Sequence, residues 1–231
     1  MKKLICMIPV RKGSERVKGK ALRKIGDTTL IEQAISLSLT FFKPEDVYLN
    51  TNWQELKEIS SKYKINFYSR KDVLANSTST NDEFMYDFLL KNECYRVVQL
   101  LPTSPFLSKN EFLDFCDLSN SNEKETIISV ASHRIASVLE SGKPINFDRN
   151  KKNPPSQTMQ AVYTYVGVLM SWERSSFINR FSHNDCAYHG TENNVYFKLS
   201  FLSQLDIDTE EDLIQAQILY SLLPKHKIMD K

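Results

Sequence analysis

Leu-Ile-Cys-Met-Ile-Pro-Val, residues 4–10, is an unbroken apolar run, and the basic stretch Arg-Lys-Gly-Ser-Glu-Arg-Val-Lys-Gly-Lys, residues 11–20, follows it directly. A continuous apolar run of this length indicates a strand buried on both faces, as in a parallel sheet covered by helices. In such sheets, ligands bind beyond the carboxyl ends of the strands. We therefore expect the basic stretch to border the functional cleft.

Helical and strand patterns alternate through the first half of the chain. This alternation predicts an α/β fold with a mostly parallel sheet and helices on both faces. Asp27 or Thr28 is the expected cap of the first helix. The loops after Val10, Asn50 and Leu101 should then border one cleft. The expected helices cover about 30–39, 54–63 and 81–90, and the expected strands cover 47–50, 65–68 and 96–101.

The second half of the chain has a different composition. Residues from about 132–160 are polar, contain three prolines and show no long helical pattern. We interpret them as an arm inserted into a single domain that covers 1–231. After the arm we expect a strand at 163–170, a helix at about 172–181, a last helix capped by Thr209 with Asp212 at its third position, and a loose tail at 225–231.

Composition limits the classes of partner. The chain has 231 residues and a formal net charge of +2, from 30 basic and 28 acidic side chains. This balance gives no general basic field for nucleic acid, so any anion site must be local. The four cysteines form no C-x-x-C pair, and no apolar run approaches the roughly 20 residues that span a bilayer. We expect a soluble, cytoplasmic protein that binds neither nucleic acid nor membrane.

The basic stretch has the residues of an anion site. The backbone amides of Gly13 and Ser14 can form a cradle, and Arg11, Arg16 and Lys20 can neutralise a triphosphate. A solvated basic loop is the alternative. The position of the stretch after a buried first strand favours function.

A P-loop is disfavoured at the same place. Five residues separate Gly13 from Gly19-Lys20 where that motif has four, and Ala21 stands where a hydroxyl should contact magnesium. The sequence therefore predicts a phosphate-binding loop of another kind.

Asp206 and Asp208 are the second candidate. Residues two apart in an extended chain point the same way, so both carboxylates can face one hard cation that also carries phosphates. The alternative is a turn that caps the helix after it. The pair alone does not decide between them.

Two further stretches leave their role open. Leu-Leu-Pro-Thr-Ser-Pro, residues 100–105, can bring hydroxyls to the cleft or can simply end a strand. His183, Cys186 and His189 have a spacing that metals use, but nothing completes a four-ligand set, so polar loop residues are the default interpretation.

In this order, the pieces resemble the acylneuraminate cytidylyltransferase family, which includes the CMP-sialic acid synthetases. The resemblance covers nearly the whole chain and is more specific than any one motif. Four stretches carry it: I-P-V-R-K-G-S-E-R-V-K-G-K-A at 8–21, Arg70 to Ala75, L-L-P-T-S-P-F at 100–106, and D-I-D-T-E-E-D-L at 206–213.

The resemblance implies a nucleotide-binding α/β sheet with a small dimerisation arm, and hence a homodimer. It implies a magnesium-dependent enzyme that transfers CMP from CTP to the anomeric hydroxyl of a nonulosonic, sialic-acid-like sugar. Asp206 and Asp208 would hold magnesium and would be catalytic together with Arg11 and Lys20. The remaining implied contacts are Arg11, Gly13, Ser14, Arg16, Lys20, Arg70, Thr80 and Asn81 for the nucleotide, and Leu101, Pro102, Thr103, Ser104, Gln157, Gln160 and Tyr163 for the sugar.

Four departures from the family pattern matter. Ala21 replaces an Asn, Glu15 replaces a Lys, Leu101 replaces a Gln, and Asn-Thr-Asn at 50–52 replaces Ser-Thr-Asp. They leave open a non-catalytic nucleotide- or sugar-binding paralogue. An enzyme for the eight-carbon acid Kdo is a second alternative, but such enzymes usually carry G-D-E-P where this chain has P-T-S-P.

Overall fold

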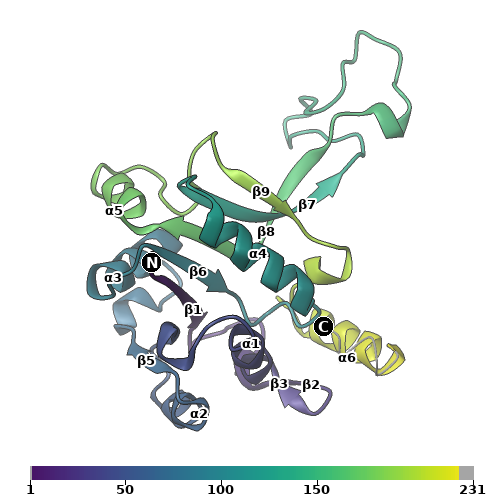
Figure 1. The fold of residues 1–231 in the computed structure, drawn as a ribbon. Helices are drawn as coiled ribbons and strands as arrows, with labels where there is room; N and C mark the ends of the chain where they lie inside the picture. Colours follow the sequence, from purple (N-terminus) through teal and green to yellow (C-terminus); the bar gives the residue numbers. More distant parts are fainter. Residues whose placement is uncertain (1, 224–231) are drawn as a thin grey trace.

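The structure is a computed structural model that describes residues 2–223, and it is built around one twisted sheet with helices on both sides (Figure 1). The strand order is β5-β4-β1-β6-β8-β7-β9. β1 pairs in parallel with β4 and β6, and only β8 runs antiparallel to its neighbours. The predicted mostly parallel sheet is confirmed. The strands are β1 (Leu4–Val10), β4 (Val47–Thr51), β5 (Asn66–Ser69), β6 (Arg96–Leu100), β7 (Thr126–His133), β8 (Val162–Glu173) and β9 (Val195–Lys198).

The side chains of β1 alternate between two separate apolar layers. Cys6 and Ile8 face the layer that contains α1, α2 and α4, whereas Ile5 and Met7 face the layer of α3 and α5. A central strand with both faces buried is what the apolar run predicts. Among residues 2–223, no helix is long and apolar enough to cross a membrane. The helices are α1 (Leu30–Ser38), α2 (Lys57–Tyr63), α3 (Asn81–Lys91), α4 (Lys109–Ser121), α5 (Arg174–Ser182) and α6 (Glu210–Leu222).

A third apolar cluster joins segments that are far apart in the sequence. Val17 from the basic stretch, Ile207 from between the two aspartates, and Leu213 of α6 are all fully buried together with Phe106. Burying an apolar side chain of this size contributes about 1.5–3 kcal/mol. The single apolar residue in each polar loop therefore anchors that loop, and the anchoring brings the basic stretch next to the aspartates.

Helix caps explain where most helices begin. Thr209 and Asp212 form a capping box at the start of α6, which confirms the predicted cap. The predicted cap of α1 was wrong: Thr29 caps that helix, because residues 24–29 form a small hairpin, β2 (Lys24–Ile25) and β3 (Thr28–Thr29). Gly26 turns the hairpin with φ 63°, which favours glycine.

The helix predicted at about 172–181 begins two residues later than expected. Trp172 belongs to β8, is 1% exposed, and donates its indole N–H to the backbone oxygen of Tyr188. Glu173 then caps α5 through its side chain. The buried hydrogen bond of Trp172 therefore keeps this residue in the strand, and the helix begins only after Glu173.

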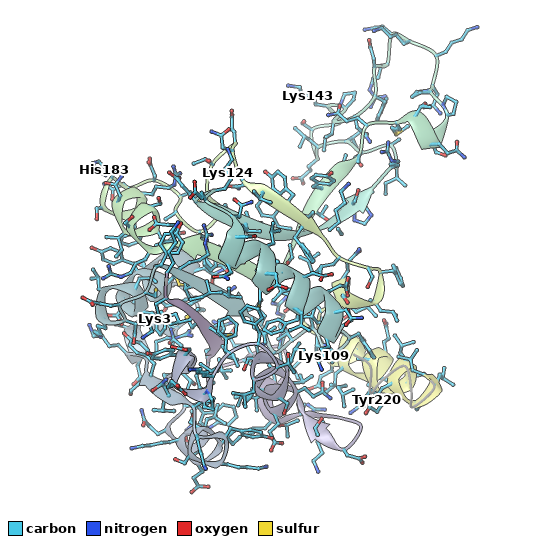
Figure 2. All side chains as sticks on the ribbon, viewed as in Figure 1. Lys3, Lys109, Lys124, Lys143, His183 and Tyr220 are labelled. Carbon is cyan, nitrogen blue, oxygen red and sulfur yellow. The ribbon has the colours of Figure 1, made fainter. Side chains whose placement is uncertain are left out.

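Several elements were not anticipated from the sequence, among them α4, β7 and β9. α4 and β7 lie between the predicted strand at 96–101 and the arm, and β7 pairs with both β8 and β9. The arm lies in the connection from β7 to β8 and stands away from the sheet, as the position of Lys143 shows (Figure 2). The division into one domain with an inserted arm stays a prediction. The tail expected at 225–231 lies outside the described residues.

Candidate functional site

A polar cavity of about 560 Å³ lies beyond the carboxyl ends of the central strands. Its size is that of a small-molecule site. It brings together six segments of the chain: 9–21, Leu30, 70–84, 101–103, Tyr188 and 206–208. The stretches after Val10 and Leu101 border it as predicted, whereas the loop after Asn50 contributes no lining residue. The lining consists of Pro9, Val10, Arg11, Ser14, Glu15, Arg16, Lys20, Ala21, Leu30, Arg70, Leu74, Ala75, Asn76, Ser79, Asn81, Phe84, Leu101, Pro102, Thr103, Tyr188, Asp206 and Asp208.

Most of the residues that the sequence singled out line this polar cavity. Three others lie next to lining residues without lining it themselves: Gly13, Thr80 and Ser104. Thr80 caps α3, since its hydroxyl accepts the backbone N–H of Glu83, and it thereby positions Asn81 at the cavity. The lining residues among the sequence candidates are Arg11, Ser14, Arg16, Lys20, Arg70, Asn81, Leu101, Pro102, Thr103, Asp206 and Asp208.

Gln157, Gln160 and Tyr163 are the sequence candidates that the chain does not bring to the polar cavity. Gln157 and Gln160 are exposed near the end of the arm, and Tyr163 is in the first part of β8 that follows it. None of the three is part of the lining. Within one copy of the chain, they stay apart from the basic and acidic groups.

Arg70 stands on one side of the polar cavity, held by neutral groups. Its Nε donates to Oδ1 of Asn50 at 2.8 Å, its Nη2 donates to the Asn50 backbone oxygen at 2.8 Å, and its guanidinium lies 4.3 Å from the ring centre of Phe84. Burial, together with the neighbouring charge of Arg11, lowers the pKa of Arg70 to about 10. At neutral pH Arg70 therefore carries an almost fully buried positive charge, and no carboxylate among residues 2–223 pairs with it.

This arrangement gives a physical reason for one departure from the family pattern. Asn50 is fully buried, and besides holding Arg70 it donates its own amide to the sulfur of Met7. Asn52 accepts the backbone N–H of Lys12 and donates to Asp72. The Asn-Thr-Asn stretch thus fixes Arg70 and the start of the basic stretch through neutral side chains.

On the other side of the polar cavity, basic side chains form ion pairs with Asp208. Asp208 Oδ1 accepts hydrogen bonds from Arg16 at 3.0 Å and from Lys20 at 3.2 Å. Lys20, mostly buried, also donates to the backbone oxygen of Ile207 at 2.5 Å. The pair of loops is thus held by charge as well as by the apolar contact of Val17 with Ile207.

Asp206 is the more buried of the two aspartates in this group. Burial raises its pKa, and the charge of Asp208 raises it further, whereas hydrogen bonds from Thr103 and Ser104 and the charge of Lys20 act in the other direction. A carboxylate desolvated beside a second carboxylate attracts a cation, because a cation relieves both effects.

The two aspartates fit a magnesium ion whose coordination shell is completed by substrate phosphates. Magnesium is commonly bound by one or two carboxylates together with phosphate oxygens and water. Within the described part of the chain, no group of three or more His, Cys, Asp or Glu side chains is placed to hold a metal. Asp206 and Asp208 would therefore hold the ion only together with phosphates or water.

The 183–189 stretch contributes a residue that sequence reasoning missed. Tyr188 lines the polar cavity, whereas the Nδ1 of His183 lies 2.8 Å from the backbone oxygen of Asn179. In the sequence, this stretch was considered only because its two histidines and cysteine have a spacing that metal ligands use. Leu74, Asn76, Ser79 and Phe84 were also missed, and only their nearness in sequence to Arg70 and Asn81 pointed to them.

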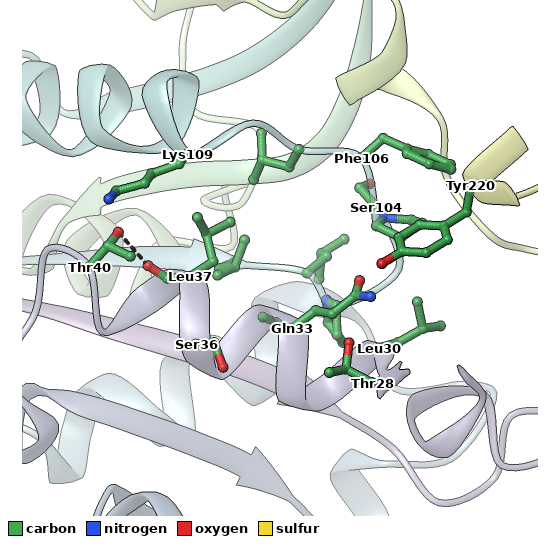
Figure 3. Close-up of a pocket in the computed structure, with 16 residues that line it drawn as sticks. Thr28, Leu30, Gln33, Ser36, Leu37, Thr40, Ser104, Phe106, Lys109 and Tyr220 are labelled. Carbon is green, nitrogen blue, oxygen red and sulfur yellow. Dashed lines mark hydrogen bonds between the residues drawn. The ribbon is translucent and has the colours of Figure 1, made fainter. Parts of the chain in front are cut away.

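A second cavity, of about 410 Å³, is lined by residues from α1, from the 100–109 stretch and from α6 (Figure 3). α1 and Tyr220 of α6 form much of its wall, and Leu30, Leu101 and Pro102 line both cavities. Gln33 contributes a buried side-chain oxygen with no hydrogen-bond partner. Its lining lacks the aspartates and the arginines, so the polar cavity is the candidate active site.

Comparisons with known proteins agree with this arrangement. A family model described as cytidylyltransferase matches residues 5–227. The N-acylneuraminate cytidylyltransferase of Streptococcus agalactiae is 22% identical over 222 residues, which cover 93% of this chain but 52% of that protein, so the chain spans about half the length of this relative. The pseudaminic acid cytidylyltransferase of Campylobacter jejuni is 25% identical over 236 residues, which cover 95% of this chain and 97% of that protein.

Solved structures agree on the fold. A CMP:2-keto-3-deoxy-manno-octonic acid synthetase in complex with CTP superposes with a TM-score of 0.69 over 95% of this chain and 98% of that chain, at 13% sequence identity. At this level of identity the likeness concerns the fold alone.

Proposed function

The chain belongs to the cytidylyltransferase family, and from this premise we propose that it transfers CMP from CTP to the anomeric hydroxyl of a nonulosonic, sialic-acid-like sugar and releases pyrophosphate. The observation that carries the proposal is the polar cavity, where the phosphate-binding candidates Arg11, Arg16 and Lys20 meet Asp206 and Asp208. Two relatives whose names specify acidic nine-carbon sugars support the sugar class.

The chemistry proposed for this cavity is in-line attack of the anomeric oxygen on the α-phosphorus of CTP. Such transfers depend on positioning and on charge neutralisation more than on covalent help from the protein. Arg11, Arg16 and Lys20 would neutralise the phosphates and the departing pyrophosphate. Asp206 and Asp208 would hold magnesium, which when bound supplies Lewis-acid neutralisation of phosphate charge and can lower the pKa of the attacking hydroxyl.

The two substrates are proposed to lie on opposite sides of β1. Arg70 is bonded to Asn50 at the end of β4, and β4 and β6 flank β1 on opposite sides. The Pro102–Ser104 turn follows β6, and its Thr103 backbone oxygen accepts the N–H of Ile207 between the aspartates. We therefore assign the nucleoside of CTP to the Arg70 and Asn81 side and the sugar to the side of residues 101–104.

A homodimer built through the arm forms part of the proposal. The arm exposes four large apolar side chains, which a second copy could cover. Gln157, Gln160 and Tyr163 lie away from the polar cavity of their own chain, so we assign their contact with the sugar to an arm that reaches a neighbouring copy. The exposed apolar residues are Ile135, Val138, Leu139 and Ile145.

The proposed location is the cytoplasm. All four cysteines are free, and two of them, Cys6 and Cys116, are buried in the apolar layers. Free cysteines suit a reducing compartment.

The test is pyrophosphate release with CTP, magnesium and a panel of acidic sugars: an N-acylneuraminic acid, pseudaminic acid and 2-keto-3-deoxy-manno-octonic acid. ATP, GTP and UTP serve as nucleotide controls. Release with CTP and a nine-carbon acid is the expected result. Release with the eight-carbon acid alone would replace the sugar class. Thermal stabilisation by CTP without release would favour a binding protein and would direct attention to Glu15, Ala21 and Leu101.

A further inference from the structure

Tyr188 reaches the polar cavity from a loop that no motif of the proposed reaction includes. Its phenolic oxygen accepts a hydrogen bond from Nε2 of Gln99 at 2.6 Å. Gln99 belongs to β6 and is fully buried, and its own side-chain oxygen has no hydrogen-bond partner. Burying a side-chain amide costs free energy unless its N–H and C=O groups have hydrogen-bond partners. The pairing with Tyr188 therefore indicates a specific use for this glutamine.

The backbone of Tyr188 is held from both sides. Its N–H donates to Oδ1 of Asp82 at 2.9 Å, and its backbone oxygen accepts the indole N–H of Trp172 at 2.9 Å. The ring centre of Tyr188 lies 4.9 Å from that of Trp172. Gly190 turns the chain directly afterwards with φ 67°, where a Cβ atom would lie 2.3 Å from Asn194. The tyrosine side chain is thus fixed in place before any ligand arrives.

The direction of the hydrogen bond decides what the hydroxyl can do. Because the Gln99 amide donates to the phenolic oxygen, the phenolic hydrogen is not used in that bond. Burial raises the pKa of Tyr188 to about 12, so the hydrogen is present at neutral pH. Tyr188 is therefore a fixed donor at the wall of the polar cavity.

The hydroxyl of Tyr188 lies on the β6 side of the polar cavity. It is hydrogen-bonded to Gln99 of β6, although the backbone of Tyr188 is held by Asp82, next to the nucleotide candidate Asn81. Arg70 is hydrogen-bonded to Asn50 of β4, on the other side of β1. The proposed sugar wall at 101–104 follows β6 directly. Position 101, where the family pattern has a glutamine, is a leucine here. The amide that this chain has lies two residues earlier, at Gln99, and it acts through the tyrosine.

We propose that Tyr188 is a specificity-determining residue for the acidic sugar, donating a hydrogen bond from its hydroxyl to an acceptor oxygen of that sugar, and that Gln99 is its positioning residue. The proposal rests on the function proposed above. In this proposal, the Tyr188 hydroxyl takes the role that the side-chain amide of a glutamine at position 101 has in the family pattern.

The experiment compares Tyr188→Phe with the unaltered enzyme. Loss of one hydrogen bond should raise the KM of the sugar by about 5- to 10-fold while the KM of CTP stays the same. The phenylalanine leaves the buried Gln99 amide without a partner, which can lower stability. The double variant Gln99→Leu/Tyr188→Phe removes that amide as well, and it should keep the raised sugar KM with a melting temperature closer to that of the unaltered enzyme. Tyr86→Phe, a half-buried tyrosine whose ring stacks on Phe181 outside the polar cavity, is the matched control and should change neither KM.

The outcomes separate this proposal from the proposed function. An unchanged sugar KM in both Tyr188 variants would overturn it, and so would a raised KM for CTP alone, which would place the tyrosine at the nucleotide. Calorimetric titration with the same sugar panel reads the affinity without turnover. Binding of a sugar without any reaction would count against the proposed function while still testing Tyr188, and binding of no sugar at all would contradict both.

Discussion

The two sides of the polar cavity hold their positive charges in different ways. Arg70 is fixed by an uncharged asparagine and an aromatic ring, so its charge is unpaired before substrate arrives. Arg16 and Lys20 are already paired with Asp208. The first side is preorganised for an anion or a polar base, because nothing has to move to free the guanidinium. On the second side, the proposed function requires Asp208 to release Arg16 and Lys20, which would then pair with the phosphates, and to hold magnesium instead. We therefore propose that binding selectivity is concentrated at Arg70 and that the chemical step depends on Asp206 and Asp208.

Replacing an aspartate should give the largest effect. Asp208→Asn removes one of two carboxylates proposed to hold magnesium, so turnover should fall about 100-fold or more. Stability should change by less than about 1 kcal/mol, since the Asp208 side chain is 48% exposed and both of its ion pairs are therefore screened by solvent. Steady-state pyrophosphate release and thermal melting measure the two quantities.

Glu210→Gln is the matched control for that variant. Glu210 makes a 2.8 Å ion pair with Arg23 close to Asp208 in sequence, but it does not line the polar cavity. It should leave turnover unchanged. Full activity of Asp208→Asn with magnesium would remove the metal assignment.

Removing the unpaired guanidinium should give the next largest effect. Arg70→Met should lower kcat/KM for CTP about 30-fold, because hydrogen bonds to a charged group contribute about 1.5–3 kcal/mol. The KM of the sugar should not change. Arg180→Met, which alters a half-buried arginine outside the polar cavity, serves as the control. An effect on the sugar alone would reverse the assignment of the two sides.

A smaller effect is expected from a variant that tests whether CTP recognition requires an uncharged side chain at position 50. Asn50→Asp would place a carboxylate against Arg70 and cancel the charge that this side offers. We expect the KM of CTP to rise about 5-fold while kcat holds, by the rule that one pKa unit corresponds to about 1.4 kcal/mol of differential interaction. A lower KM in this variant would show that the free charge is not what recognises CTP.

The smallest expected effect concerns a carboxylate outside the polar cavity. Glu111 joins the start of α4 to the loop before the aspartates: it accepts hydrogen bonds from Ser108 at 2.6 Å and from the backbone N–H of Ser200 at 2.6 Å. Burial alone would raise the pKa of Glu111, but these bonds and those from Ser203 outweigh it, and the pKa lies below its ordinary value of 4.5. The ionised form is therefore the one that the fold stabilises.

Glu111→Gln should lower the free energy of unfolding by about 1 kcal/mol at neutral pH, allowing for its partial exposure to solvent. Because the folded pKa is depressed, the difference between the two proteins should be full above pH 4.5 and should disappear as pH falls through the folded pKa. Urea unfolding at several pH values measures it. A difference that grows as pH falls would contradict the stated sign.

The sequence predicted the first half of the fold better than the second. The apolar run at 4–10 and the alternation after it depend on local patterns, and these identified the central strands. α4 was missed, although Ser108 caps it and it buries Phe112, Phe115 and Cys116. Its remaining positions are mostly polar, so its pattern resembles a loop. The start of α5 depended on a tertiary hydrogen bond of Trp172, which no local pattern contains.

The candidate site divides in the same way. Residues in recognisable motifs, such as Lys20 and Asp208, were identified from the sequence, and the structure brings them within 3.2 Å of each other. Tyr188 was not, because its place depends on partners that are 16, 89 and 106 positions away. Val17 and Ile207 hold the two loops together, but in the sequence each is one apolar residue among polar ones.

The measurement that tests the central claim most directly is analysis of the reaction product by mass spectrometry, starting from CTP and an acidic nine-carbon sugar labelled with ¹⁸O at the anomeric hydroxyl. We predict equal amounts of pyrophosphate and a CMP–sugar that retains the label, because the sugar oxygen attacks the α-phosphorus. Release of pyrophosphate with unesterified CMP, or no CMP–sugar from any sugar of the panel, would contradict the account.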